Sequence, residues 1–217
     1  GAFTAPTAAQ DGAWHAISAG KHALVVAPTG SGKTLAAFLW ALDRLHIQES
    51  APNQKTGTKV LYISPLKALG VDVERNLRSP LIGIAQTANR MGADVPNVTV
   101  GVRSGDTPPK ERRQLISNPP DILITTPESL YLMLTSKARS TLAAVHTVII
   151  DEVHAVAGTK RGAHLAVSLE RLDQILDQPV QRIGLSATVE PVETVARFLG
   201  GVAPVDIVQP PSEKKWE

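Results

Sequence analysis

Cysteine is absent from all 217 residues of the chain. A disulfide framework and a cysteine-based metal site are therefore excluded, and the composition suits a reducing compartment. Long apolar runs are also missing: none approaches the roughly 20 residues that cross a bilayer, and no basic segment followed by an apolar one opens the sequence. We accordingly expect a cytoplasmic protein with no membrane partner.

Aromatic residues make up only 4% of the chain, and neither sign of charge dominates, since the net charge is +2. The pI near 9.0 is mildly basic, so composition alone does not demonstrate a nucleic-acid partner. With 43% hydrophobic residues, the chain is long enough for one sizeable core and too short for two full domains. We expect one domain over residues 1–203, followed by an extended segment and the start of a linker over 204–217.

Six short runs of β-branched and aliphatic residues are continuous rather than alternating, which is typical of strands covered on both faces. These runs span 23–26, 60–64, 98–102, 122–125, 145–150 and 182–185. The helices expected around them span 35–45, 66–88 in two pieces, 108–116 behind a Thr107 cap, 129–134, 161–176 and 190–199. Alternating strands and helices predict an α/β fold, with a mostly parallel sheet and helices on both faces.

A phosphate-binding loop is predicted at residues 27–34, where an apolar run turns through Ala-Pro-Thr-Gly-Ser-Gly-Lys-Thr into a helical pattern. Such a turn directs backbone N–H groups at a triphosphate, and its glycines let the backbone approach closely. Lys33 would reach the β- and γ-phosphates and serve in catalysis, and the Thr34 hydroxyl would bind Mg²⁺. The nucleotide-binding residues predicted here are Thr29, Gly30, Ser31, Gly32, Lys33 and Thr34. Ala27 holds a place that is usually glycine, and the alternative is a Gly-Ser turn that happens to precede a lysine.

Two adjacent acids, Asp151 and Glu152, follow the apolar run 145–150. Ligands of a parallel α/β sheet lie at the carboxyl ends of its strands, so this position is informative. Phosphoryl-transfer chemistry predicts that Asp151 holds the magnesium and that Glu152 orients and deprotonates the attacking water as a catalytic residue. The alternative, an acidic helix cap, loses weight because a phosphate-binding loop follows another buried strand.

Three small residues, Ser186, Ala187 and Thr188, follow the run 182–185. By themselves they indicate no more than a helix cap, since serine and threonine are favoured there. The imidazole of His154 has two nitrogens, and the hydroxyls of Ser186 and Thr188 at a neighbouring strand end can satisfy them. We therefore expect His154, Ser186 and Thr188 to couple the two acids to a second site.

These motifs together resemble the first RecA-like domain of a superfamily 2 helicase of the DExH type. The phosphate loop, Asp151-Glu152-Val153-His154 and Ser186-Ala187-Thr188 stand in the order of that family's motifs I, II and III. A closer likeness is to the bacterial large helicase-related family, Lhr. The stretches that carry it are 27–39, 64–69, 126–130, 160–165 and 168–172. The resemblance implies a RecA-like P-loop NTPase domain that uses ATP and Mg²⁺ as cofactors.

The resemblance also gives a role to Gln10, which stands in a Pro-Thr-Ala-Ala-Gln segment like the family's Q motif. The glutamine of that motif hydrogen-bonds N6 and N7 of adenine, and an amide has the matching acceptor and donor. Without the resemblance, a glutamine in a first helical turn is more often solvated. We expect Gln10 to select adenine.

Further strand-end loops resemble the family's nucleic-acid motifs. They are expected to present backbone N–H groups, hydroxyls and one lysine to phosphates without reading sequence. The residues are Pro65, Lys67, Gly105, Thr126 and Pro127. Arg161 either contacts the nucleic acid or pairs with a carboxylate. The basic cluster Lys110, Arg112 and Arg113 is expected to be a solvated helix face.

The resemblance implies the ATP-binding half of an ATP-dependent motor on single-stranded nucleic acid, with DNA favoured over RNA. By analogy with Lhr it would move 3′ to 5′ and unwind DNA or RNA:DNA duplexes in DNA repair. A second RecA-like domain would supply the arginine finger, so the fragment alone should be poorly active. Two alternatives stay open. The first is a kinase, which would share the phosphate loop and need a pocket for the phosphate acceptor, but would not require Ser186 or Gln10. The second is an ATP-dependent nucleic-acid remodeller or clamp that unwinds nothing.

Overall fold

The computed structural model describes residues 6–49, 56–65, 81–83, 86, 90, 92 and 98–210. Seven strands form one sheet, and every pair of neighbours is parallel. The strands are β1 (His22–Val26), β2 (Val60–Ile63), β3 (Val100–Arg103), β4 (Ile122–Thr125), β5 (Thr147–Ile150), β6 (Gln181–Ser186) and β7 (Val205–Val208). The predicted α/β class with a parallel sheet is confirmed.

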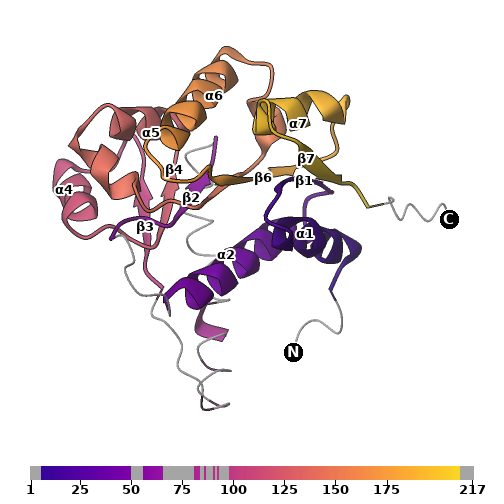
Figure 1. The fold of residues 1–217 in the computed structure, drawn as a ribbon, viewed down its shortest axis with the longest axis horizontal. Helices are drawn as coiled ribbons and strands as arrows, with labels where there is room; N and C mark the ends of the chain where they lie inside the picture. The colour runs from indigo at the N-terminus through magenta and orange to yellow at the C-terminus, as the bar shows by residue number, and fades with distance from the viewer. Residues whose placement is uncertain are drawn as a thin grey trace.

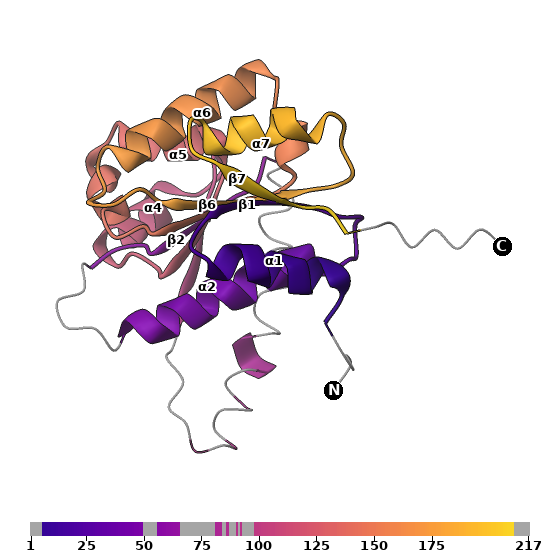
Figure 2. The ribbon, with the colours of Figure 1, turned by 45° about the vertical axis from the view of Figure 1, so that its right-hand side comes forward.

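Helices cover both faces of the sheet (Figures 1 and 2). The elements are α1 (Ala8–Ser18), α2 (Lys33–Glu49), α4 (Pro109–Ser117), α5 (Pro127–Leu134), α6 (Lys160–Asp173) and α7 (Val192–Gly200), with the 3₁₀ turns η1 (Lys137–Leu142) and η2 (Val153–Ala155). Figure 2 shows α1 and α2 on one side of the sheet and α5, α6 and α7 on the other. Within the described residues, no helix is both long and apolar enough to cross a membrane.

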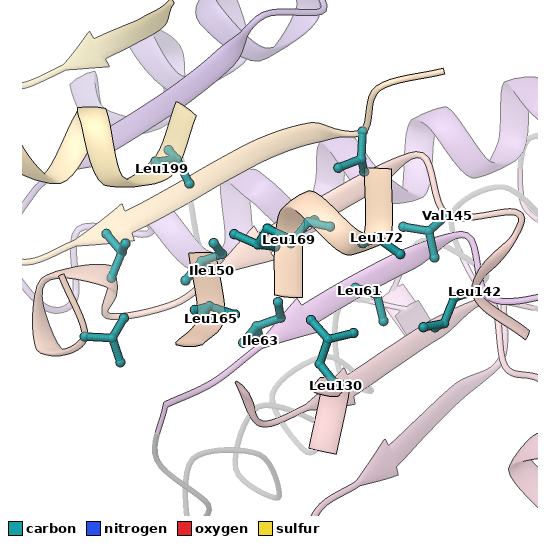
Figure 3. Close-up of a cluster of buried hydrophobic side chains, with 14 of the residues drawn as sticks. Leu61, Ile63, Leu130, Leu142, Val145, Ile150, Leu165, Leu169, Leu172 and Leu199 are labelled. Atoms are coloured by element: carbon teal, nitrogen blue, oxygen red, sulfur yellow. The ribbon is translucent and has the colours of Figure 1, made fainter. Parts of the chain in front are cut away.

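Two apolar clusters lie on the two faces of the sheet because side chains alternate along each strand. Leu61 and Ile63 of β2 face α5 and α6, whereas Val60 and Tyr62 face α2. Figure 3 shows the first cluster, in which the leucines of α6 lie over β2 and β5. All four β2 residues are fully buried. The expectation of strands covered on both faces is confirmed for β2, β4, β5 and β6, whereas β3, at the edge of the sheet, is only partly buried.

The seventh strand lies after residue 203, where the predicted domain ends. Residues 205–208 are extended, as expected, and they pair in parallel with residues 22–25 of β1. Lys21 and Asp206 form an ion pair beside this pairing, with 3.1 Å between Nζ and Oδ2. The sheet thus continues past residue 203. A short edge strand that contains a carboxylate has no sequence signal that distinguishes it from a linker.

The helices lie close to their predicted positions, with shifted ends. Thr107 does not cap α4: Pro108 takes the cap position without a side-chain bond, and the Thr107 hydroxyl accepts from the backbone N–H of Ser104 at 2.8 Å. Most of the helix expected at 66–88 lies outside the described residues, and so does Lys67. Thr7 caps α1 through a capping box with Gln10.

The strand order is β3-β4-β2-β5-β6-β1-β7. The strands β5, β6 and β1 are neighbours and end at Asp151, Ser186 and the phosphate loop. The strands β3, β4 and β2 form the other half and end at the loops expected to track nucleic acid. The topology therefore separates two groups of motifs along one edge of the sheet.

Candidate nucleotide and nucleic-acid site

The loop after β1 has the backbone of a phosphate-binding turn. Gly30 and Gly32 have φ angles of +84° and +83°, in the left-handed region that favours glycine. Lys33 begins α2 and is only 5% exposed, with its Nζ 3.5 Å from the Pro28 carbonyl oxygen. The Ser31 hydroxyl is buried and has no hydrogen-bond partner within the described part of the chain. A turn of this kind at a helix N-terminus, with a buried lysine and an unpartnered hydroxyl, is suited to phosphate oxygens.

Gln10 lies against this loop and is 8% exposed. Its Oε1 accepts from the Thr7 backbone N–H at 3.0 Å, and its Nε2 lies 3.5 Å from the Gly32 carbonyl oxygen. The Thr7 hydroxyl donates to the Ser31 carbonyl at 2.9 Å. The first helix is thus fastened to the phosphate loop. A bound adenine would hydrogen-bond the same Gln10 amide that makes these contacts. The contact between Gln10 and adenine stays a prediction.

Asp151 and Glu152 leave the end of β5 in different environments. Asp151 is 6% exposed, whereas Glu152 is half-buried. The Glu152 backbone N–H donates to Asp151 Oδ1 at 3.0 Å. Glu152 has φ +43° and ψ +44° and is the non-glycine residue with positive φ in the described chain. A left-handed conformation costs a non-glycine residue about 1–2 kcal/mol and recurs at functional sites.

Tyr62 donates its hydroxyl hydrogen to Asp151 Oδ2. Burial raises the pKa of the Tyr62 hydroxyl, and the charge of Asp151 raises it further, so the phenol stays a protonated donor. No motif in the sequence indicates this role for Tyr62. Its only signal was one hydroxyl in an otherwise aliphatic strand, two residues before the strand-end serine.

His154 and Ser186 meet, as the sequence predicts, with 3.0 Å between Nδ1 and Oγ. The backbone N–H of Ala187 also points at Nδ1, at 3.3 Å, and Glu152 Oε2 lies 3.4 Å from the same nitrogen. The Ser186 hydroxyl itself donates to the Ala187 carbonyl oxygen at 2.8 Å, so the Ser186–Ala187 segment presents both an acceptor and a donor to Nδ1. Thr188 is exposed, and within the described residues its hydroxyl makes no hydrogen bond to His154.

The loops expected to contact nucleic acid lie at the ends of β2, β3 and β4. Thr126 and Pro127 are buried, and the Thr126 hydroxyl caps α5 by accepting from the Ser129 N–H at 3.3 Å. Gly105 is exposed. Pro65 is buried and its carbonyl accepts from Arg161 Nη1. These positions share one edge of the sheet, and their contacts with nucleic acid stay predictions.

Arg161, in the first turn of α6, pairs with a carboxylate, one of its two predicted roles. Its Nη2 lies 2.9 Å from Glu128 Oε2, and its Nε donates to Glu128 Oε1. The guanidinium lowers the pKa of Glu128 to about 2. The hydrogen bond to Glu128 also raises the pKa of Arg161. The guanidinium therefore joins α6 to the loop after β2 and to the first turn of α5, which follows β4.

The prediction that Arg112 belongs to a solvated helix face is wrong. Arg112 is half-buried and donates from Nε to the Thr107 carbonyl at 2.7 Å and from Nη2 to the Gly105 carbonyl at 2.6 Å. Lys110 and Arg113 are exposed, as expected. Arg112 turns inward because the loop before α4 leaves two carbonyls within its reach.

The side chains that could bind a metal here suit Mg²⁺ better than a metal ion whose ligands all come from the protein. Among the described residues, no three histidine, cysteine, aspartate or glutamate side chains gather to hold an ion. Asp151 and the half-buried Thr34 supply one carboxylate and one hydroxyl near the predicted phosphates. Magnesium commonly keeps several waters and binds through one or two carboxylates together with substrate phosphates.

Known proteins are similar to this chain over its whole length. The chain is 69% identical over 216 residues to the Lhr helicase of Mycolicibacterium smegmatis, covering 100% of the chain and 14% of the relative. It is 62% identical to the Lhr helicase of Escherichia coli, over 97% of the chain and 14% of that protein. The solved structure of the Mycobacterium smegmatis Lhr helicase bound to ssDNA and AMP-PNP matches with a TM-score of 0.92, over 100% of this chain and 27% of that one.

The chain thus spans about a seventh of the length of these curated relatives. The resemblance to Lhr inferred from the motifs is confirmed. The family model of the DEAD/DEAH box helicases matches residues 7–197. The chain therefore belongs to the DEAD/DEAH box helicase family.

Proposed function

We propose that the chain is the ATP-binding half of a motor that moves along single-stranded DNA. The observation that carries this proposal is the strand order, which gathers the phosphate loop, Asp151 and Ser186 on neighbouring strands. The loops that contain Pro65, Gly105 and Thr126 follow β2, β3 and β4, the strands of the other half of the sheet, and lie along the same edge. A nucleotide site and a strand-tracking surface then share one rigid sheet.

In this proposal each residue near the nucleotide has one task. Lys33 neutralises the β- and γ-phosphates, and Thr34 and Asp151 hold Mg²⁺, which supplies charge neutralisation of the phosphate oxygens. Glu152 accepts a proton from the attacking water. Its half-buried position beside the buried Asp151 supports that division, because the buried carboxylate suits an ion and the accessible one suits a water.

The His154–Ser186 contact is the proposed link between hydrolysis and movement. It joins the segment after β5 to the end of β6 at 3.0 Å. Glu152 and His154 share one short turn. A shift of Glu152 on loss of the γ-phosphate would therefore move His154 and change its contact with Ser186. Thr188, exposed beside this contact, would face a second domain rather than His154.

The second RecA-like domain is proposed to complete the catalytic set with an arginine finger. The curated relatives are about seven times as long as this chain, which supports further domains. The similar Lhr helicase structure is described as bound to ssDNA and AMP-PNP, and this supports DNA as the track. Movement 3′ to 5′ and a role in DNA repair are proposed from the same likeness.

The test is Glu152→Gln in the full-length protein that contains this domain. The amide is nearly isosteric but accepts no proton, so ATP affinity should be kept while DNA-stimulated hydrolysis falls by roughly 10²- to 10⁴-fold. The matched control is Glu193→Gln on the exposed side of α7, which should leave both unchanged. Hydrolysis at the normal rate in Glu152→Gln would contradict the proposed base.

A remodeller or clamp would use the same ATPase without unwinding. A strand-displacement assay with 3′- and 5′-tailed duplexes separates the two functions and gives the polarity in one experiment. ATP-dependent displacement from the 3′-tailed substrate supports the motor. Hydrolysis with no displacement from either substrate would favour the remodeller.

A further inference from the structure

Tyr62 occupies the centre of the sheet without solvent contact. It lies on β2, level with Ile124 of β4 and Ile149 of β5, and it is 0% exposed. A buried phenol needs a hydrogen-bond partner, and here the acceptor is Asp151 Oδ2. The ring is held as well, because it stacks on Phe38 with 4.8 Å between centroids and 16° between planes.

The Phe38 ring ties this contact to the phosphate loop. Phe38 is 2% exposed and lies on α2, the helix that begins at Lys33. A continuous path of packed groups thus leads from the helix behind the phosphate loop, through two rings, to the carboxylate after β5. Both ends of this path belong to the proposed nucleotide site.

The Asp151 carboxylate is held by two donors from different elements. Tyr62 of β2 donates to Oδ2, and the Glu152 backbone donates to Oδ1 at 3.0 Å. Each carboxylate oxygen can accept a further hydrogen bond or bind a cation, so neither donor blocks the group. Together they fix the plane of a carboxylate that is 6% exposed. The Tyr62 hydroxyl is the one of these donors that a substitution can remove.

We propose that Tyr62 is a positioning residue that orients the Asp151 carboxylate for the magnesium ion of the bound nucleotide. This inference rests on the proposed function of Asp151. Groups that hold a metal ligand in place typically contribute 10- to 100-fold to metal affinity or activity. Without the hydroxyl, a buried anionic oxygen loses its donor and the carboxylate is free to turn.

The experiment measures nucleotide affinity with Mg²⁺ and with EDTA, using a fluorescent ATP analogue and the full-length protein. The readout is the gain in affinity that Mg²⁺ confers, which is independent of hydrolysis. In Tyr62→Phe this gain should fall about 10- to 100-fold, while affinity in EDTA should stay within about twofold. The matched control is Tyr131→Phe, on the surface of α5, which should leave both affinities unchanged.

Two further variants sharpen the test. With Asp151→Asn in the background, Tyr62→Phe should have no additional effect on the gain, because the hydroxyl then has no metal ligand to orient. Phe38→Leu keeps the hydroxyl and removes the ring that it stacks on, so it should lower the gain less than Tyr62→Phe. Phe38→Leu also supplies the test if Tyr62→Phe does not fold.

The outcomes separate this inference from the proposed function. A full magnesium-dependent gain in Tyr62→Phe or, if that variant does not fold, in Phe38→Leu would overturn the positioning role. An equal loss of affinity in Mg²⁺ and in EDTA would also overturn it, because Tyr62 would then serve the fold alone. A wild-type protein with no gain from Mg²⁺ would instead overturn the magnesium-binding role proposed for Thr34 and Asp151.

Discussion

Arg161 and Glu128 bind each other across the gap between α6 and α5, with two guanidinium nitrogens facing two carboxylate oxygens. The third guanidinium nitrogen donates to the carbonyl of Pro65. This planar arrangement uses the fork geometry that distinguishes arginine from lysine. Two loops that we expect to follow a nucleic-acid strand are thereby held at a fixed spacing.

Substituting either residue of this pair by glutamine should show whether Arg161 positions the loops or contacts DNA directly. If Arg161 acts through the pair, Arg161→Gln and Glu128→Gln should each weaken ssDNA binding about 2- to 5-fold, as expected for a partly exposed ion pair. The double variant should then be no weaker than either single one. Fluorescence anisotropy with a labelled oligonucleotide measures the three affinities in the full-length protein.

Direct contact with phosphate would give the opposite pattern. Glu128→Gln would strengthen binding by removing a negative charge, and Arg161→Gln would lower the slope of log affinity against log salt by about 0.7. Arg113→Gln, on the exposed face of α4, is the control for a general change in surface charge. An unchanged salt slope in Arg161→Gln supports positioning.

The Gln10 contacts allow a sharper test of base selection than truncation to alanine. Glutamate at this position can keep the acceptor for the Thr7 N–H, since it is a usual capping-box residue, but it loses the amide donor. Gln10→Glu should therefore keep the melting temperature and lose the preference for ATP over GTP, a contact of about 1–3 kcal/mol. Calorimetric titration with both nucleotides measures it. An intact preference would show that Gln10 does not select the base.

Much of the fold was predictable because buried parallel strands have a strong sequence signal. The runs at 60–64 and 122–125 are apolar except for the Tyr62 hydroxyl and the terminal Ser64 and Thr125, so both faces had to be covered. The motif residues were found for a related reason: each follows such a run, where the carboxyl end of a strand places it at the site. His154 and Ser186 were expected to meet on this basis, and they do.

The features that were missed depend on partners distant in sequence. Tyr62 belongs to a strand, and its bond to Asp151 exists only because β2 and β5 are neighbours. Arg112 resembled its exposed neighbours Lys110 and Arg113 until the loop before α4 placed two carbonyls beside it. Strand β7 needed the free edge of β1. Hydropathy patterns contain no information on such pairings.

His146 should make the fold sensitive to acid. Its Nδ1 lies 2.9 Å from the Thr147 hydroxyl oxygen, and its Nε2 is buried without a partner among the described residues. Burial, together with the charges of Arg44 and Lys59, lowers the pKa of His146 to about 4. These three side chains line a cavity of about 230 Å³ at the amino ends of the strands.

The direction of the pH effect follows from where the proton binds. The unfolded chain protonates His146 below about pH 6.5, whereas the folded chain does so only near pH 4, so the free energy of unfolding falls as the pH drops between these values. The loss should reach about 3 kcal/mol, and His146→Gln should remove most of it. Urea unfolding at pH 7, 5.5 and 4 measures the effect, with the exposed His15→Gln as the control. A pH dependence unchanged in His146→Gln would contradict it.

Gly32 should tolerate no side chain, for two separable reasons. Its φ of +83° lies in the left-handed region, and a Cβ there would stand 2.4 Å from Gln10 Nε2. Gly20 shares the first feature, with φ +75°, but has nothing within 4 Å of its Cβ position, so Gly20→Ala measures the backbone cost alone. That cost should be about 1–2 kcal/mol of unfolding free energy for both variants.

Gly32→Ala should in addition displace Gln10 and abolish measurable nucleotide binding, while Gly20→Ala binds normally. Normal affinity in Gly32→Ala would mean that the contact between α1 and the phosphate loop is dispensable for the nucleotide.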